Sequence, residues 1–107
     1  MQNNGSFNER IYTLLRKVPK GKVTTYKALA EKAGTKAYRA VGQAMRCNPY
    51  APEVPCHRVV SSDGTIGGFS GTKNPGSSEI KRKITMLRKE GISVRNNRIV
   101  DFEKIVY

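Results

Sequence analysis

The chain has 107 residues, which is enough for one domain with a modest core. Its 20 lysines and arginines against 8 acidic residues give a net charge of +12, so a polyanion such as nucleic acid is the leading expectation for a partner. A generic solvated basic surface is the alternative explanation of this charge. No apolar run approaches the roughly 20 residues of a membrane span, so no membrane segment is expected.

The cysteine and histidine content restricts the redox setting and the metal chemistry. The two cysteines, Cys47 and Cys56, cannot build a disulfide framework, and the polar N-terminus lacks a signal-peptide pattern. We therefore expect an intracellular, monomeric protein. With one histidine and no Cys-x-x-Cys pair, no zinc or other metal site is expected, and nothing in the sequence suggests a cofactor.

An amphipathic helix is predicted over 7–18. Ser6 and Glu9 form a capping-box pattern at its start, and Pro19 follows its end. The apolar residues that recur at helical spacing are Phe7, Ile11, Leu14, Leu15 and Val18.

Two shorter helices are predicted next. Thr25 can cap a helix over 26–33, which Gly34 ends. Thr35 can cap a further helix over 36–47. Two short helices around a glycine-containing turn match the outline of a helix-turn-helix.

This predicted helix-turn-helix, about 25–47, has two distinct faces. The residues expected to face inward from its second helix are Ala37, Ala40, Val41, Ala44 and Met45. The outward face is expected to present side chains that contact phosphates and base edges, namely Lys36, Arg39, Gln43 and Arg46. Charge and pattern together predict DNA contact through this element.

The second half predicts short and irregular elements. A proline-broken segment leads to an active-site loop over 55–60, and a short hairpin or tight turn follows over 59–66. The glycine-rich segment 67–78 is expected to be a loop, and a helix is predicted over about 79–90. A small terminal hairpin is expected within 92–107. We therefore expect one domain over 1–107, mainly α with a small β component.

The most informative motif is Pro55-Cys56-His57-Arg58-Val59. A thiolate is a strong soft nucleophile, and neighbouring cations stabilise it. His57 is the only histidine, so the one side chain that titrates near neutral pH stands beside a cysteine. The alternative is a buried, inert thiol, but the polar residues that follow Cys56 argue against a purely apolar setting.

Several points about this motif stay open. A carboxylate should orient the imidazole, and spacing does not choose among Glu53, Asp63, Glu79 and Glu90. Arg58 can either stabilise the thiolate or form a structural ion pair. For Cys47, late in a helix and without a neighbouring imidazole, the expected state is buried and inert.

Five ordered motifs resemble the O6-alkylguanine-DNA alkyltransferases, also called methylated-DNA–protein-cysteine methyltransferases. The resemblance covers roughly residues 6–92 and corresponds to the C-terminal active-site domain of that family. It implies a winged helix-turn-helix-like fold and a duplex DNA substrate that contains O6-alkylguanine. The motifs are KVTTY (22–26), RAVGQAMRCNP (39–49), PCHRVV (55–60), GFSG (68–71) and LRKEG (87–91).

The resemblance implies a role for each matching residue of the reaction centre. Cys56 would accept the alkyl group and keep it, so that each molecule acts once. His57 would act as the base through a water, with Glu90 polarising the imidazole. Tyr26 would protonate or hydrogen-bond the departing guanine. Arg39 would enter the base stack while the target nucleotide is flipped out.

The resemblance also implies roles around the pocket. Asn48 would brace the turn between the recognition helix and the active site, and Ser70 would donate to the alkylated O6. The carbonyls of Cys56 and Val59 would receive the guanine amino group. Two departures stand out: Phe69 replaces a tyrosine that many members carry, and the loop over 72–78 is longer than expected.

Three other functions compete with this interpretation. Alkyltransferase-like proteins share the helix-turn-helix and the pocket but carry tryptophan in place of the cysteine; they bind alkylated guanine and recruit other repair factors. Cys56 argues against that role, whereas the small size of the chain is compatible with it. A thiol hydrolase with a Cys56-His57 dyad would need no basic face, and a transcriptional regulator would leave the cysteine motif without a purpose.

Overall fold

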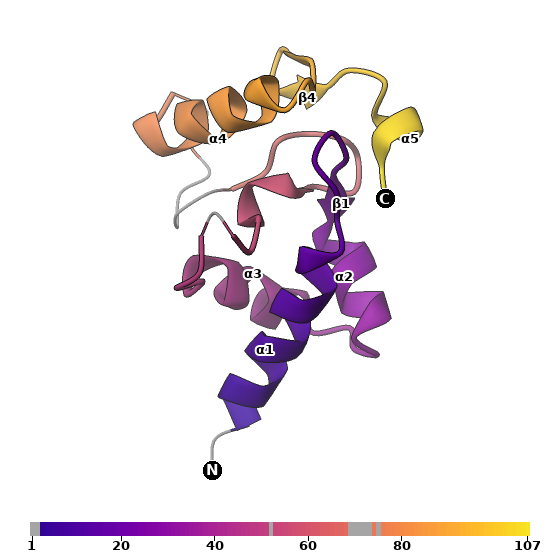
Figure 1. The fold of residues 1–107 in the computed structure, drawn as a ribbon, viewed down its shortest axis with the longest axis vertical. Coiled ribbons are helices and arrows are strands. Elements are labelled where there is room, and N and C mark those ends of the chain that lie inside the picture. Colours follow the sequence, from indigo (N-terminus) through magenta and orange to yellow (C-terminus); the bar gives the residue numbers. More distant parts are fainter. Residues whose placement is uncertain (1–2, 52, 69–73, 75) are drawn as a thin grey trace.

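The computed structural model describes residues 3–51, 53–68, 74 and 76–107. Over these residues the chain is mainly helical with a small β component, as the sequence predicts, and the strands form two small sheets. Helices α1, α2 and α3 form one end of the molecule, and α4, the β3–β4 hairpin and α5 form the other (Figure 1). The helices are α1 (Asn3–Arg16), α2 (Tyr26–Lys32), α3 (Tyr38–Arg46), the 3₁₀ turn η1 (Cys56–Arg58), α4 (Ser78–Lys89) and α5 (Phe102–Ile105).

Two pairs of very short strands connect these helices. Strand β1 (Thr24–Thr25) runs parallel to β2 (Val59–Val60), with Thr24 opposite Val59. Strand β3 (Val94–Arg95) runs antiparallel to β4 (Arg98–Ile99). Within the described residues, no helix is long and apolar enough to cross a membrane.

The molecule has two hydrophobic cores, and the β1–β2 pair lies between them. The first core joins α1, α2 and α3 and includes Val59, whereas the second lies beneath α4 and includes Val60. Consecutive strand residues point to opposite faces, so two adjacent valines can serve both cores. The turn η1 immediately precedes these valines. The Cys56-His57-Arg58 motif is therefore held at the junction of the two cores.

Two of the predicted helices lie close to their expected bounds; the cap predicted for α2 is confirmed, whereas no cap was predicted for α4. The hydroxyl of Thr25 accepts a hydrogen bond from the Ala28 amide at 3.0 Å at the start of α2. At the start of α4, Ser77 accepts from the Ile80 amide at 3.2 Å. Each hydroxyl satisfies a backbone N–H that has no partner within its helix.

The predicted bounds of α1 are wrong at both ends. The helix begins at Asn3, so Ser6 lies inside it rather than before it, and it ends at Arg16. Serine and glutamate are tolerated within helices, so a capping-box pattern does not force a start. Val18 lies beyond the helix but is buried in the first core, which explains why the apolar period continued to it.

The start of α3 is also displaced from the prediction. The Thr35 hydroxyl accepts from the Ala37 amide at 3.0 Å, which closes a local turn before the helix instead of capping it. Ala37 is consequently the N-cap residue and is exposed rather than inward-facing. Lys36 is exposed as expected but precedes the helix.

The turn and the terminal hairpin predicted after Cys56 are both present, with differences in strand pairing and at the C-terminus. Residues 59–66 contain a tight turn, with the Ser61 amide bonded to the Thr65 carbonyl, but β2 pairs with the distant β1. A hairpin is present over 94–99, where Asn96 and Asn97 both have positive φ, as its two-residue turn requires. Residues 102–105 form helix α5 instead of extended chain, because Phe102 and Ile105, three residues apart, pack against the second core.

The glycine of α3 provides a stability test. Gly42 lies inside α3 without a positive φ, and a Cβ added there would meet no atom within 4 Å. Because alanine favours the helix over glycine, we expect Gly42→Ala to raise the free energy of unfolding by about 0.5–1 kcal/mol in urea denaturation. Gly34→Ala is the matched control. Its site is equally open but has a φ of 77°, so that substitution should destabilise the protein.

Candidate active site

The turn η1 holds Cys56 firmly while leaving it accessible. The Cys56 amide donates to the Val54 carbonyl at 2.8 Å, and the Arg58 amide donates to the Pro55 carbonyl at 2.9 Å. The Asn48 side chain also donates to the Val54 carbonyl, at 2.9 Å. The side chain of Cys56 packs against the first core and is partly exposed. A substrate can thus reach the sulfur.

His57 and Arg58 share one carboxylate, that of Glu90. The His57 Nε2 lies 2.9 Å from a Glu90 oxygen, and only 3% of the His57 side chain is exposed. Arg58 donates to both oxygens of Glu90, at 2.8 and 2.7 Å, and also to the Val18 carbonyl at 2.8 Å. Of the four carboxylates left open by spacing, Glu90 is the one that contacts the imidazole. Arg58 forms an ion pair rather than facing solvent freely.

The charges of this cluster leave His57 able to accept a proton. Burial lowers the pKa of His57 and outweighs the opposing effect of Glu90. Burial alone would raise the pKa of Glu90, but hydrogen bonds from Arg58 and His57 and their charges hold it below its usual value. Glu90 is therefore ionised, and the neutral imidazole carries its proton on Nε2. The opposite nitrogen, Nδ1, is buried and has no hydrogen-bond partner among the described residues.

Lys83 is a buried site residue that we did not predict from the sequence. Its side chain is fully buried, and its ammonium donates to the carbonyls of Val59, Ile66 and Gly68 at 2.7, 2.6 and 3.0 Å. Burial lowers the pKa of Lys83 to about 7, while a negative charge on Cys56 would favour its ammonium form. The spacing in the sequence could have indicated its burial. Lys83 follows Ile80 by three positions and precedes Leu87 by four, which places it on the inward face of the helix.

Tyr26 lies on the same part of the site. Its hydroxyl donates to the Gly68 carbonyl at 3.2 Å, the carbonyl that also accepts from Lys83. Burial, and then the nearby Cys56, raise the pKa of Tyr26 to about 12, so the phenol keeps its proton at neutral pH. Phe69 and Ser70 lie outside the described residues, as do Thr72, Lys73 and Pro75 of the loop over 72–78.

Two further predicted positions have defined backbone roles. The Val59 carbonyl, expected to receive a guanine amino group, already accepts from Lys83. Asn48 holds the chain that leads from α3 to η1, because it donates to Val54 and accepts from the Tyr50 amide at 3.0 Å. The side-chain amide of Asn48 thus bridges the two ends of the segment between α3 and Cys56.

Helix α3 presents a basic surface to solvent. Arg39, Gln43 and Arg46 are exposed, as expected for an outward face, while Val41 and Ala44 are buried. Cys47 at the end of the helix is exposed, so its predicted burial is wrong. Because Cys47 is the C-cap residue of α3, it lies beyond the residues that the inward face of this helix covers.

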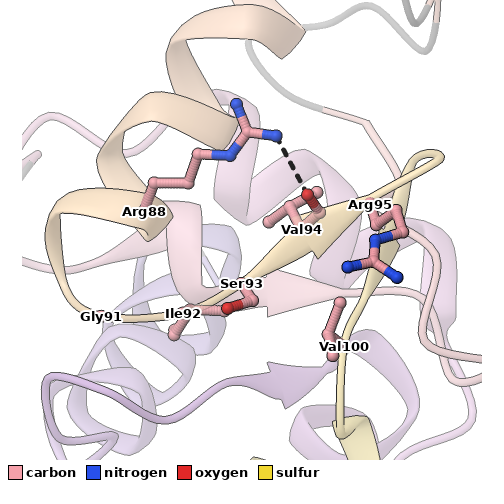
Figure 2. Close-up of a pocket in the computed structure, with 7 residues that line it drawn as sticks. All are labelled: Arg88, Gly91, Ile92, Ser93, Val94, Arg95 and Val100. Carbon is pink, nitrogen blue, oxygen red and sulfur yellow. Dashed lines mark hydrogen bonds between the residues drawn. The ribbon is translucent and has the colours of Figure 1, made fainter.

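A separate hollow lies at the end of the molecule that α4 and the β3–β4 hairpin form. Figure 2 shows it between the last turn of α4 and the β3–β4 region, where Arg88 donates to the Val94 carbonyl at 2.9 Å. Its volume is about 450 Å³, and no residue predicted for the active site lines it. It is lined by Arg88, Gly91, Ile92, Ser93, Val94, Arg95 and Val100.

Comparison with known proteins identifies the family. The family model of the DNA binding domain of 6-O-methylguanine DNA methyltransferase matches residues 6–92. The chain belongs to this family. A methylated-DNA–protein-cysteine methyltransferase from Metallosphaera sedula is 45% identical over 92 residues, which cover 86% of this chain and 54% of that protein. The chain thus spans about half the length of this curated relative.

Solved structures of the same family resemble the chain. Atl1 from S. pombe, in complex with damaged DNA containing O6-carboxymethylguanine, is 30% identical with a TM-score of 0.76, covering 96% of this chain and 95% of that chain. The O6-methylguanine-DNA methyltransferase from Pyrococcus kodakaraensis is 43% identical with a TM-score of 0.66, covering 79% of this chain and 46% of that chain.

Because His57 and Arg58 share the carboxylate of Glu90, we expect the free energy of unfolding to fall in acid. We expect Glu90→Gln to lower the free energy of unfolding by about 2 kcal/mol at neutral pH, because charge-assisted hydrogen bonds are lost. Since the folded-state pKa of Glu90 lies below its ordinary 4.5, the contribution is present above that pH and disappears as pH falls through the folded-state pKa. Urea denaturation at several pH values measures this, with the exposed Glu103→Gln as the control. A constant difference between pH 7 and pH 2 would contradict it.

The buried lysine predicts a pH dependence of the same sign in a higher pH range. Between about pH 7 and 10.5 the unfolded chain keeps the Lys83 proton that the folded protein releases, so folding gains stability as pH rises. We therefore expect the stability of the wild-type protein relative to Lys83→Met to increase across this range in urea denaturation. The exposed Lys81→Met on the same helix should show no such slope relative to wild type. A pH-independent difference for Lys83→Met would refute the assignment.

Proposed function

We propose that this protein repairs DNA by moving an alkyl group, such as methyl, from O6 of guanine to Cys56. The observation that carries the proposal is the paired arrangement of an accessible thiol and a neutral His57 whose Nδ1 is unoccupied among the described residues. A base with a free lone pair next to a nucleophile is the arrangement that thiol chemistry needs. Membership of the methyltransferase family supports the same substrate.

The transfer has a simple atom balance. The Cys56 thiol gives its proton to Nδ1 of His57, directly or through a water. The sulfur then attacks the alkyl carbon, so that an S–C bond forms as the C–O6 bond breaks. Glu90 stabilises the imidazolium that results, since it already accepts from Nε2. The alkyl group stays on Cys56 as a thioether, so each protein molecule acts once.

The other product, the guanine anion, needs a proton or a hydrogen bond as it departs. The Tyr26 hydroxyl keeps its proton at neutral pH and lies near Cys56, so it serves as the donor. Lys83 holds the carbonyls of Val59 and Gly68 and thereby shapes the walls on either side of the nucleotide. Ser70 is proposed to donate to the alkylated O6.

Helix α3 supplies the DNA-binding surface in this proposal. Its exposed Arg39 enters the base stack when the target nucleotide leaves it, while Gln43 and Arg46 contact the duplex. Lys36, just before the helix, adds a phosphate contact. Binding to damaged DNA is known for Atl1, whose structure resembles this chain over nearly all of its length.

A second candidate function is lesion recognition without transfer. The extent of the match to Atl1, 96% of this chain and 95% of that one, favours it. The accessible cysteine beside a base favours transfer, because a binding protein has no use for either group. The two functions differ in one measurable product, the alkylated cysteine.

The decisive experiment weighs the intact protein after incubation with a duplex that contains O6-methylguanine. We expect the mass to increase by one methyl group, located by peptide mapping to Cys56. Cys56→Ala should gain no mass but still bind the duplex. Cys47→Ala is the matched control, because Cys47 is also exposed yet lies at the end of α3.

The outcomes separate the candidates. Tight binding of the alkylated duplex without a mass increase would reject transfer and favour lesion recognition. Loss of transfer in Cys47→Ala would mean that the nucleophile is assigned to the wrong thiol. Failure to distinguish the alkylated duplex from an unmodified one would reject both functions.

A further inference from the structure

Tyr38 is a large exposed side chain without a partner inside the protein. Its exposed fraction is 45%, and among the described residues no side-chain hydrogen bond, ring contact or cation engages it. The other exposed tyrosines are covered by cations: Arg16 lies over the ring of Tyr50, and Lys32 lies over that of Tyr107. Tyr50 also donates to Glu9 at 3.0 Å. The ring of Tyr38 is therefore available for an external contact, and its neighbours decide whether one is expected.

The position of Tyr38 indicates which contact that is. It is the first residue of α3, directly before Arg39, the residue proposed to enter the base stack. Gly42 follows one turn later and Arg46 two turns later, so the three lie along one side of the helix. Tyr38 and Arg46 are separated by roughly 12 Å along the axis.

Gly42 is an independent indication that something approaches this side of α3. Glycine inside a helix costs about 1 kcal/mol relative to alanine. Neither its backbone conformation nor its packing requires glycine, since no atom lies within 4 Å of an added Cβ. A glycine that the protein itself does not need is consistent with close approach of a partner backbone.

The charge along this segment favours DNA as that partner. Residues 32–52 contain four basic residues and no acidic one. Basic side chains near an exposed aromatic ring suit a nucleic acid, which offers phosphates to the cations and base faces to the ring.

We infer that Tyr38 is a second side chain, beside Arg39, that packs against the bases next to the flipped nucleotide. This inference rests on the proposed function, because it assumes that α3 faces the damaged duplex. The ring fills part of the space that the extruded base vacates. Its apolar faces stack on the neighbouring bases, which the charged guanidinium of Arg39 does not cover. The hydroxyl is not needed for this contact. Tyr38 is thus a determinant of lesion binding, separate from the chemistry at Cys56.

The test measures binding to a duplex in which 2-aminopurine, a fluorescent base, neighbours O6-methylguanine. The proteins carry Cys56→Ala, so that the lesion is not consumed. We expect Tyr38→Ala to weaken the affinity on the order of tenfold, as loss of one aromatic stacking contact does, and to reduce the 2-aminopurine fluorescence change. Tyr38→Phe should retain both within about twofold, since it keeps the ring. Circular dichroism and thermal unfolding verify that each variant is folded.

Two further variants separate a stacking contact of Tyr38 from the effect of a lost charge and from the loss of any exposed ring. Arg39→Ala should reduce the slope of log affinity against log salt by about one, whereas Tyr38→Ala should leave this slope unchanged. Tyr107→Ala removes an equally exposed ring outside α3 and should bind like the parent protein.

The results distinguish the inference from the function on which it rests. If the parent Cys56→Ala protein does not prefer the alkylated duplex, the proposed function fails. If it does prefer that duplex but Tyr38→Ala binds as tightly as Tyr107→Ala, only the role of Tyr38 is overturned. A loss in Tyr38→Phe equal to that in Tyr38→Ala would overturn the stacking contact as well.

Discussion

The carboxylate of Glu90 joins the two halves of this protein. It stands at the end of α4, on the side of the second core, and receives hydrogen bonds from His57 and Arg58 in the turn between the cores. Arg58 extends the connection to the Val18 carbonyl, just beyond the end of α1. One ionised group thus fixes the imidazole, the turn and the relative position of two helical layers. Arginine is suited to this because its planar fork satisfies both oxygens at once.

A second polar cluster holds the opposite wall of the site. Lys83 donates to three carbonyls, and Tyr26 donates to one of them. Burying an ammonium is costly, and three acceptors at hydrogen-bond distance offset that cost. The two clusters flank Cys56 with different electrostatics, since Glu90 is ionised whereas burial lowers the pKa of Lys83 to about 7. The thiol is thereby surrounded by groups that can hold or stabilise charge.

The two ends of the molecule carry different tasks in the proposed function. The α2–α3 end presents exposed cations and an exposed ring, while the α4 end supplies the carboxylate and the lysine that shape the site. The short β1–β2 pair connects the two ends, because Val59 packs in the first core and Val60 in the second. A protein with only two-residue strands at this junction depends on side-chain hydrogen bonds to keep the halves aligned.

The local pattern of the chain determined much of this structure. Helical spacing and caps specified α2 and α4, because hydroxyls at 25 and 77 act on amides only three residues away. The cysteine motif and the family resemblance likewise depend on short contiguous segments. Local signals were misleading where a competing local turn existed, as at Thr35, whose hydroxyl closes a turn before α3.

Only the tertiary structure decided the long-range partners. Spacing left four carboxylates available to His57, and the contact with Glu90 requires α4 to fold back across 32 intervening residues. The pairing of β2 with β1 could not be read from two adjacent valines, because either a local hairpin or a distant strand satisfies their backbone. The sequence analysis did not anticipate the burial of Lys83, which the convergence of three carbonyls on its ammonium explains. The sequence by itself therefore determined most of the helices and the cysteine motif proposed as the nucleophile, whereas the fold decided which charged groups surround that cysteine, since electrostatic partners are selected by distance in space.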